Sequence, residues 1–155
     1  MILGVTGPRP YKIPRFDPSE ISKRMEKFLN MFDGPKTLIS GGALGIDQLW
    51  IKVGIKLKLP VIAILPFEGY DGKWDFQTRN EYQKLLRFCQ EIIYTCEPGY
   101  DINKFRLRNE MIVDKSDFLV AYFVDFSGGT GNCIRYAQSQ NKSIFYNSLL
   151  DADTI

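Results

Sequence analysis

Glycine-rich segments are the first residues of this chain whose type and spacing could bind a ligand. Each of three such segments follows an apolar run and precedes a segment of helical period: Thr6-Gly7, Ser40-Gly41-Gly42-Ala43-Leu44-Gly45 and Ser127-Gly128-Gly129-Thr130-Gly131. Glycine permits a positive φ and lets a phosphate approach without meeting a Cβ. A helix N-terminus adds free N–H groups and partial positive charge. The three segments are therefore candidate phosphate-binding turns, although each could also be a tight turn that needs glycine.

Several charged side chains could complete such a site. Asp47 falls in the first turn of a predicted helix, where it could accept hydrogen bonds from ribose hydroxyls or act only as a partner of the helix dipole. Asp114 is expected to face the same crevice, whereas Asp117 is expected to bind backbone amides. Arg9 and Arg108 could each reach a phosphate, or could be solvated surface charges.

The loop that follows the third apolar run combines glycine with aromatic residues. Pro66 and Phe67 open it, and Tyr70 and Trp74 follow. This composition suits a loop that stacks on a base or closes over a ligand. A packed surface loop is the alternative. Trp50 lies on the apolar stripe of its predicted helix and is assigned to the core.

Other site chemistries are excluded by composition. The chain contains no histidine, which excludes Ser–His, Cys–His and His–metal mechanisms. Cys89, Cys96 and Cys133 have no C-x-x-C spacing, which argues against a disulfide framework or a zinc site. The dinucleotide fingerprint G-x-G-x-x-G and the Walker pattern are absent. We expect no metal site and no required cofactor beyond a bound nucleotide ligand.

Short apolar runs alternate with segments of helical period, and this alternation is typical of a doubly wound, Rossmann-like α/β domain with helices on both faces of the sheet. The sheet is expected to be mainly parallel, with one domain over 1–147 and a C-terminal tail over 148–155. Its six strands are predicted at Met1–Val5, Thr37–Ile39, Val61–Leu65, Glu91–Tyr94, Phe118–Val124 and Ser143–Tyr146. Helices are predicted from Asp17, after Gly45, near Gln77–Phe88 and Asn103–Lys115, and over about Asn132–Gln140. The three glycine segments then meet at one edge of the sheet.

Size and charge limit the partners of this domain. The chain has 155 residues and a net charge of +2. This charge is smaller than the excess of basic residues expected of a nucleic-acid-binding protein. It has no long apolar run and no signal-peptide pattern, so a cytoplasmic protein without membrane contact is expected. Its 11 Phe, 8 Tyr and 2 Trp favour a homo-oligomer, because aromatic residues are enriched in interfaces.

These motifs together resemble the SLOG superfamily, and in particular its small YpsA-like and phage-encoded members. The resemblance extends from Met1 to about Tyr146 and implies a Rossmann-like nucleotide-binding fold. The superfamily includes phosphoribohydrolases, the DNA-loading protein DprA and sensors of NAD-derived signals in phage defence. The residues that carry it are Gly4-Val5-Thr6-Gly7-Pro8-Arg9-Pro10, Ser40-Gly41-Gly42-Ala43-Leu44-Gly45-Ile46-Asp47, Arg108-Asn109-Glu110-Met111, Ser116-Asp117 and Gly128-Gly129-Thr130.

The match to the phosphoribohydrolase branch is partial. Asn109 stands where that branch has Lys, and Ile134 and Arg135 occupy the positions of its working glutamate. Since glycosidic cleavage needs a carboxylate, an arginine there disfavours hydrolysis by that mechanism. The resemblance and the turns together assign ligand binding to Thr6, Gly7, Arg9, Ser40, Gly41, Gly42, Gly45, Asp47, Pro66, Phe67, Arg108, Asn109, Gly128, Gly129, Thr130 and Asn132.

The sequence therefore favours a protein that binds a nucleotide or a small molecule derived from NAD or ADP-ribose. Such a protein would be a sensor or, if phage-encoded, one that sequesters a defence signal. The first alternative is an N-glycosidase, of phosphoribohydrolase or deoxyribosyltransferase type, that uses Asp47 or Asp114. The second alternative is DprA-like binding of single-stranded DNA.

Overall fold

Six strands form one sheet in which all neighbouring strands are parallel, as the alternation of elements predicts. The computed structural model describes residues 1–150. The strand order is β4-β3-β2-β1-β5-β6. The strands are β1 (Ile2–Thr6), β2 (Thr37–Ser40), β3 (Val61–Leu65), β4 (Glu91–Tyr94), β5 (Phe118–Phe123) and β6 (Ser143–Ser148).

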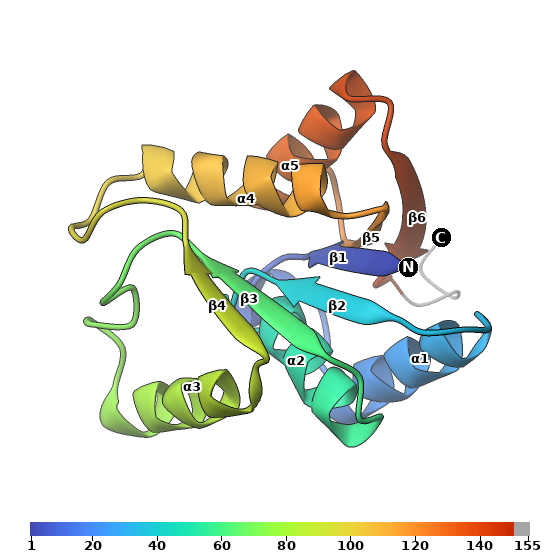
Figure 1. Cartoon of the computed structure of the whole chain (residues 1–155), viewed down its shortest axis with the longest axis horizontal. Coiled ribbons are helices and arrows are strands. Elements are labelled where there is room, and N and C mark those ends of the chain that lie inside the picture. Colours follow the sequence, from blue (N-terminus) through green and yellow to red (C-terminus); the bar gives the residue numbers. More distant parts are fainter. Residues whose placement is uncertain (151–155) are drawn as a thin grey trace.

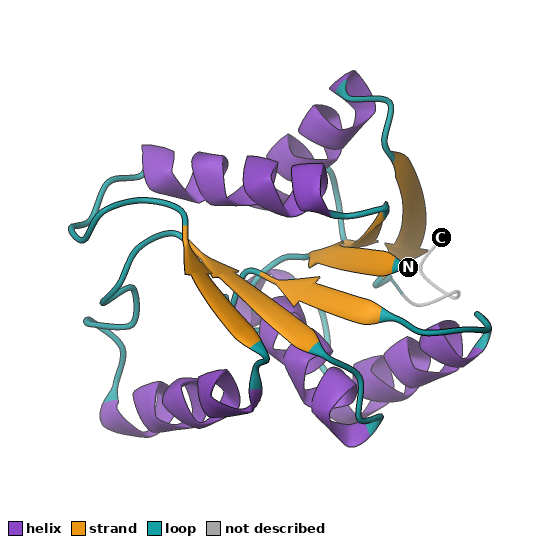
Figure 2. Cartoon of the chain, viewed as in Figure 1, coloured by secondary structure: helices purple, strands orange, loops and turns teal. Residues whose placement is uncertain are grey.

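Helices cover both faces of this sheet, as Figures 1 and 2 show. One face carries α1 (Pro18–Asn30), α2 (Ile46–Lys56) and α3 (Phe76–Phe88). The opposite face carries α4 (Asn103–Lys115) and α5 (Gly128–Ser139), which pack against each other. A short 3-10 helix, η1 (Pro10–Lys12), follows β1. The predicted doubly wound, Rossmann-like α/β fold is therefore confirmed.

The strand order places a switch point beside β1. From β1 the chain builds outward through β2 and β3 to β4, and then crosses by α4 to β5 on the other side of β1. Connections that leave β1 and β5 thus diverge at the carboxyl ends of these two strands. In open parallel sheets ligands bind in the crevice that such a divergence creates. Gly7 and the Gly128-Gly129 pair follow these two strands.

Two local contacts fix the strands and helices that border the crevice. Asp117 accepts a hydrogen bond from the Ile2 amide at 2.6 Å, which confirms that its carboxylate binds a backbone amide. Trp50 is fully buried in the core, and its indole N–H donates to the carbonyl of Leu3 at 3.4 Å. Both contacts hold β1, the central strand, against its neighbours.

Two predicted boundaries at the C-terminal side differ from the structure by more than one residue. α5 begins at Gly128 and not near Asn132, because the Gly128-Gly129 pair forms the first helical turn and not a loop before it. β6 continues to Ser148, and Leu149 is buried. The predicted tail, 148–155, falls mostly on residues 151–155, which lie outside the described residues. Within residues 1–150 no helix combines the length and apolar character that crossing a bilayer requires.

The described surface bears large aromatic side chains, which supports the expectation of self-association. Tyr11, Phe76, Phe88 and Tyr100 are all more than 60% exposed. Burial of such side chains between copies would release ordered water and stabilise an oligomer. We predict that light scattering at high micromolar concentration gives a mass that is a multiple of 17.8 kDa. A mass of one chain under those conditions would contradict this prediction.

Candidate functional site

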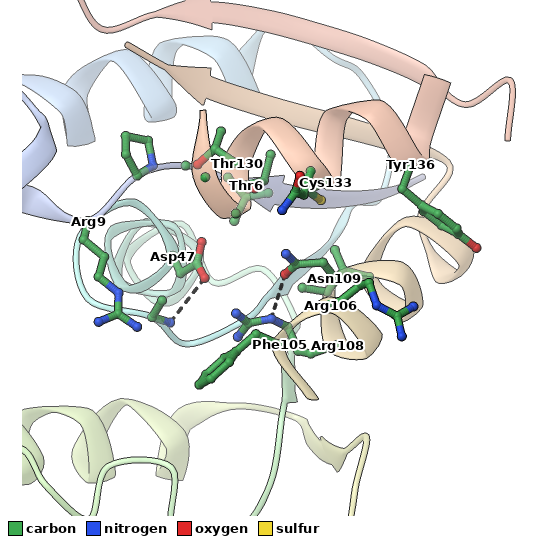
Figure 3. A pocket seen from close by; sticks show the side chains of 18 of the residues that line it. Thr6, Arg9, Asp47, Phe105, Arg106, Arg108, Asn109, Thr130, Cys133 and Tyr136 are labelled. Atoms are coloured by element: carbon green, nitrogen blue, oxygen red, sulfur yellow. Dashed lines mark hydrogen bonds between the residues drawn. The ribbon is translucent and has the colours of Figure 1, made fainter. Parts of the chain in front are cut away.

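A cavity of about 700 Å³ lies where the carboxyl end of β1, α4 and the N-terminus of α5 meet. Figure 3 shows that its side chains come from several separate segments of the chain. Thr6, Gly7 and Arg9 come from the end of β1 and its loop, and Asp47 comes from α2. Of the predicted site residues, those that line this cavity are Thr6, Gly7, Arg9, Asp47, Arg108, Asn109, Gly128, Gly129, Thr130 and Asn132.

The N-terminus of α5 contributes backbone amides to the cavity. The N–H groups of its first residues, Gly128 to Thr130, have no acceptor within the helix. Ser127 is the N-cap, but its side chain does not cap the helix, because its hydroxyl donates to Asp125. Gly131 is required behind this turn, since a Cβ there would collide with the carbonyl of Phe126. The helix terminus is thus open to an anion.

Asp47 is the buried carboxylate of the site and is 7% exposed. It accepts a hydrogen bond from the Ala43 amide at 3.2 Å. Arg108, also buried, donates from Nη1 to the carbonyl of Gly41 at 2.6 Å. A Cβ at Gly41 would lie 2.8 Å from that Nη1 and 3.0 Å from Asp47 Oδ2. Glycine at this position therefore lets the guanidinium and the carboxylate approach the same point.

The pKa of Asp47 reflects a balance between burial and its neighbours. Burial raises the pKa of this carboxyl to about 6, because the charged form loses its hydration. The positive charge of Arg108, the Ala43 amide and the positive charge of Arg9 oppose that rise. Asp47 therefore changes its ionisation just below neutral pH. Such a group can accept hydrogen bonds at pH 7 and can also take up a proton.

Positive side chains outnumber negative ones around the cavity. Arg9, Lys12, Arg106, Arg108 and Arg135 line it, against Asp47 and Glu110. Glu110 is paired with Arg106 at 2.8 Å. Arg135 donates to the carbonyl of Phe126 and to Asn132 Oδ1, so it is held beside the start of α5. The cavity therefore carries a net positive charge that suits an anionic ligand.

The glycine segment after β2 supports the cavity from behind and does not line it, except at Ala43. Ser40 donates its hydroxyl to the carbonyl of Asp47 at 2.7 Å and accepts from the Gly42 amide. Gly45 is the N-cap of α2, with a φ of 91°. Ser40, Gly41, Gly42 and Gly45 thus shape the turn that presents Asp47, and the structure places them one layer behind the cavity.

The loop over Phe67–Asp75 does not reach the cavity, contrary to the expectation of a base-stacking lid. Phe67 and Tyr70 are buried in a cluster with Tyr82 of α3, against which Trp74 and Phe105 pack. These rings make edge contacts with one another, such as that of Tyr70 and Phe105 at 5.7 Å. The alternative of a packed surface loop is therefore correct. Pro66 and Phe67, which the sequence assigned to ligand binding, do not line the cavity.

Asp114 also lies away from the cavity. It is exposed near the end of α4, and it accepts a hydrogen bond from the hydroxyl of Tyr136 at 2.8 Å. Tyr136 itself lines the cavity, whereas Asp114 is not among the lining residues. The expectation that Asp114 faces the crevice is wrong, because its position near the end of α4 places it beyond the reach of the switch point.

The sequence interpretation missed several residues that line the cavity. From α4 these are Phe105, Arg106 and Glu110, and from α5 they include Cys133 and Tyr136. Burial raises the pKa of the Cys133 thiol to about 12, so it does not supply a thiolate. Phe105 lies three residues before Arg108, and this helical spacing could have indicated that the two side chains share a face of α4. The remaining missed residues are Val5, Pro8, Tyr11, Lys12, Ile102, Ile112 and Arg135, with Ala43 from the turn after β2.

The arrangement of possible metal ligands can be described for residues 1–150. No group of three or more Cys, Asp or Glu side chains in that range is arranged to hold a metal ion. The carboxylates of the cavity, Asp47 and Glu110, instead have basic neighbours.

Comparison with known proteins shows relatives over most of the chain. A family model described as the YspA SLOG family matches residues 6–154. An uncharacterized SPbeta prophage-derived protein, YoqJ of Bacillus subtilis strain 168, is 34% identical over an alignment of 116 residues that covers 64% of this chain and 68% of that protein. A UPF0398 protein of Latilactobacillus sakei is 33% identical over an alignment of 136 residues that covers 78% of this chain and 72% of that protein.

Solved structures share the fold at low sequence identity. DNA processing protein A (DprA) from Streptococcus pneumoniae has a TM-score of 0.70 at 16% identity, over 93% of this chain and 49% of that chain. DprA from Helicobacter pylori has a TM-score of 0.65 at 20% identity, over 94% of this chain and 64% of that chain. The chain thus spans about half to two thirds of these DprA chains, and the likeness is one of fold.

The raised pKa of Asp47 generates a prediction about stability. The folded state holds this proton up to about pH 6, but the unfolded chain releases it near pH 4. Between these values the folded state binds more protons, so this group destabilises the ligand-free fold increasingly as the pH rises. We predict that Asp47→Asn raises the free energy of unfolding by about 2 kcal/mol more at pH 7 than at pH 4.

Urea unfolding of both proteins at the two pH values measures this difference. Asp33→Asn, at an exposed loop position, is the control and should show no such dependence. A difference between Asp47→Asn and the original chain that is the same at pH 4 and pH 7 would contradict the prediction.

Proposed function

We propose that this chain, which belongs to the YspA SLOG family, binds a nucleotide or a small molecule derived from NAD or ADP-ribose in the cavity beside β1 and α5. The observation that carries the proposal is the geometry of this one cavity. On one side it has a helix N-terminus with open amides, and on the other it has the buried carboxylate of Asp47. Family membership supports a nucleotide-related ligand.

The phosphate of such a ligand fits the start of α5. The amides of Gly128, Gly129 and Thr130 can donate to phosphate oxygens, and the helix dipole favours the negative charge there. Gly129 has open space where its Cβ would stand, so an anion can approach the backbone closely. Lys12 and Arg135 also line the cavity and can neutralise the charge.

The ribose fits the floor of the cavity. Ionised Asp47 accepts hydrogen bonds, as vicinal ribose hydroxyls require. Asn109 accepts from Arg108 Nε through its Oδ1 at 2.8 Å, which leaves its amide NH₂ as a donor for the ligand. The two residues are held by one arginine, because Arg108 contacts Asn109 and carries charge beside Asp47. This arrangement orients a sugar between a donor and an acceptor.

The base then lies against α4. Phe105 and Ile102 line the cavity and provide an apolar surface. Arg108 stands over the Phe105 ring at 5.9 Å, which holds the ring in place. These residues replace the loop after β3 as the surface on which a base can stack.

Binding without turnover is favoured over catalysis. At the positions where the phosphoribohydrolases have their glutamate, Ile134 is buried in the core and Arg135 lines the cavity. Such a binder would act as a sensor or would sequester a signal molecule. One relative, YoqJ of Bacillus subtilis, is described as prophage-derived, which supports a role of this kind in phage counter-defence.

N-glycosidic cleavage is the second candidate function, and the pKa of Asp47 favours it. A buried carboxyl whose pKa is about 6 can steady a positive charge at the sugar or activate water near neutral pH. Asp114 does not line the cavity, so this reaction would rest on Asp47. Single-stranded DNA binding ranks behind both, because a net charge of +2 provides little attraction for a phosphate backbone.

The binding proposal predicts a specific effect at Gly129. Calorimetry with AMP, ADP-ribose and NAD should detect binding of at least one of them to the original chain. An alanine Cβ at 129 meets no protein atom within 4 Å, so Gly129→Ala should fold normally. The Gly129→Ala variant should bind that ligand with an affinity lower by roughly tenfold or more, because the methyl group displaces the phosphate from the amides.

Ser19→Ala is the matched control, since Ser19 holds the same second position in α1 and does not line the cavity. It should leave the affinity unchanged. No heat and no thermal shift with any of the three compounds would refute the binding proposal. Equal affinity of Gly129→Ala and the original chain would refute the placement of the phosphate.

The two leading functions are separated by product analysis. We predict that incubation with AMP, dAMP and NAD releases no free base at pH 6 or pH 7, as chromatography of the mixtures would show. Base release that Asp47→Asn abolishes would instead establish the N-glycosidase. Base release that persists in Asp47→Asn would show that Asp47 is not the carboxylate that catalyses the reaction.

A further inference from the structure

A second, smaller cavity of about 260 Å³ adjoins the first at the N-terminus of α5. Pro8, Lys12 and Thr130 line both cavities, so the two meet at these residues. Val124, Asp125 and Ser127, from the segment between β5 and α5, line only the smaller one. A ligand whose phosphate lies at the start of α5 therefore has two directions in which it can extend.

Thr130 is a polar side chain without a partner at this junction. It is 7% exposed, and its hydroxyl has no hydrogen-bond partner among residues 1–150. Its oxygen is not among the fully buried polar atoms that lack a partner, so it is open to the two cavities that the side chain lines and a ligand atom can reach it. Figure 3 places Thr130 beside Thr6 at the upper rim of the larger cavity. Lys12 adds a positive charge, since its Nζ lies 2.9 Å from where a Gly128 Cβ would stand.

The smaller cavity itself does not suit a phosphate. Asp125 accepts hydrogen bonds from the amide and the hydroxyl of Ser127, and these bonds hold the pKa of its carboxyl below the ordinary range. The Asp125 carboxylate would repel a phosphate in the smaller cavity. Its oxygens retain lone pairs that can accept hydrogen bonds from hydroxyl groups of a ligand. With the hydroxyls of Ser127 and Thr130 nearby, it suits a neutral group that carries several hydroxyls. A sugar has that chemistry.

We propose that the ligand is a nucleoside diphosphate that carries a second sugar. Its nucleoside occupies the larger cavity, its diphosphate lies against Lys12, Thr130 and the amides of α5, and its terminal sugar occupies the smaller cavity beside Asp125. This inference rests on the proposed function, since it assumes a nucleotide in the larger cavity. It goes further by assigning the smaller cavity to the part of the ligand beyond the diphosphate.

Calorimetry with AMP, ADP and ADP-ribose tests the assignment. The original chain should bind ADP-ribose at least tenfold more tightly than ADP. Asp125→Asn keeps an oxygen that can accept from the Ser127 amide but removes the charge that holds two hydroxyls. It should weaken ADP-ribose by roughly tenfold and change the affinity for ADP less than twofold.

Asp101→Asn is a matched control. Asp101 is exposed and accepts a hydrogen bond from the amide two residues later, as Asp125 does, but it lines neither cavity. It should leave all three affinities unchanged. A circular dichroism melt of each variant verifies folding.

The possible failures are distinguishable. If AMP and ADP bind but ADP-ribose binds no more tightly than ADP, the second subsite is refuted and the proposed function stands. The same holds if Asp125→Asn weakens ADP and ADP-ribose equally. If none of the three compounds binds, the proposed function itself is refuted.

Discussion

The site depends on one close approach. The Arg108 guanidinium and the Asp47 carboxylate both lie next to the point where a Cβ of residue 41 would stand, and only glycine leaves that point free. Either charge buried alone would lose its hydration without compensation. Together, with the Ala43 amide and the Gly41 carbonyl as further partners, the two charges are accommodated beneath one surface. The hydrogen bond from Arg108 to the Gly41 carbonyl joins α4, on one face of the sheet, to the turn between β2 and α2, which leads to the opposite face. Asn109, the next residue of α4, is aligned by the same guanidinium.

The sequence was sufficient for the parts of the fold that depend on local pattern. Parallel strands separated by helices place every strand-to-helix turn at one edge, so the neighbourhood of Gly7, Asp47 and Gly128 followed from the alternation alone. The cap of α1 by Asp17 and the burial of Trp50 followed from helix-start chemistry and period. The start of α5 at Gly128 did not, because glycine has low helix propensity, and Gly128 itself has a φ of 63°.

The composition of the loop after β3 was equally compatible with a lid and with a packed cluster. The deciding contacts are tertiary, because Tyr82 of α3 and Phe105 of α4 supply the partner rings for Phe67 and Tyr70.

Lys12 and Glu110, which line the cavity, were missed in the sequence for a related reason. A charged residue on a short turn or an exposed helix face has no sequence signal that separates a solvated position from one beside a cavity.

The position of α4 has a consequence for how such a domain can diversify. This helix supplies Phe105, Arg106, Asn109 and Glu110 to the cavity, yet only Arg108, Ile112 and Val113 among its residues are buried. Substitutions at the partly exposed positions would change which base is recognised while the core and the sheet remain intact. One helix can therefore act as an exchangeable selectivity module, which allows closely related sequences to acquire different ligands without redesign of the fold.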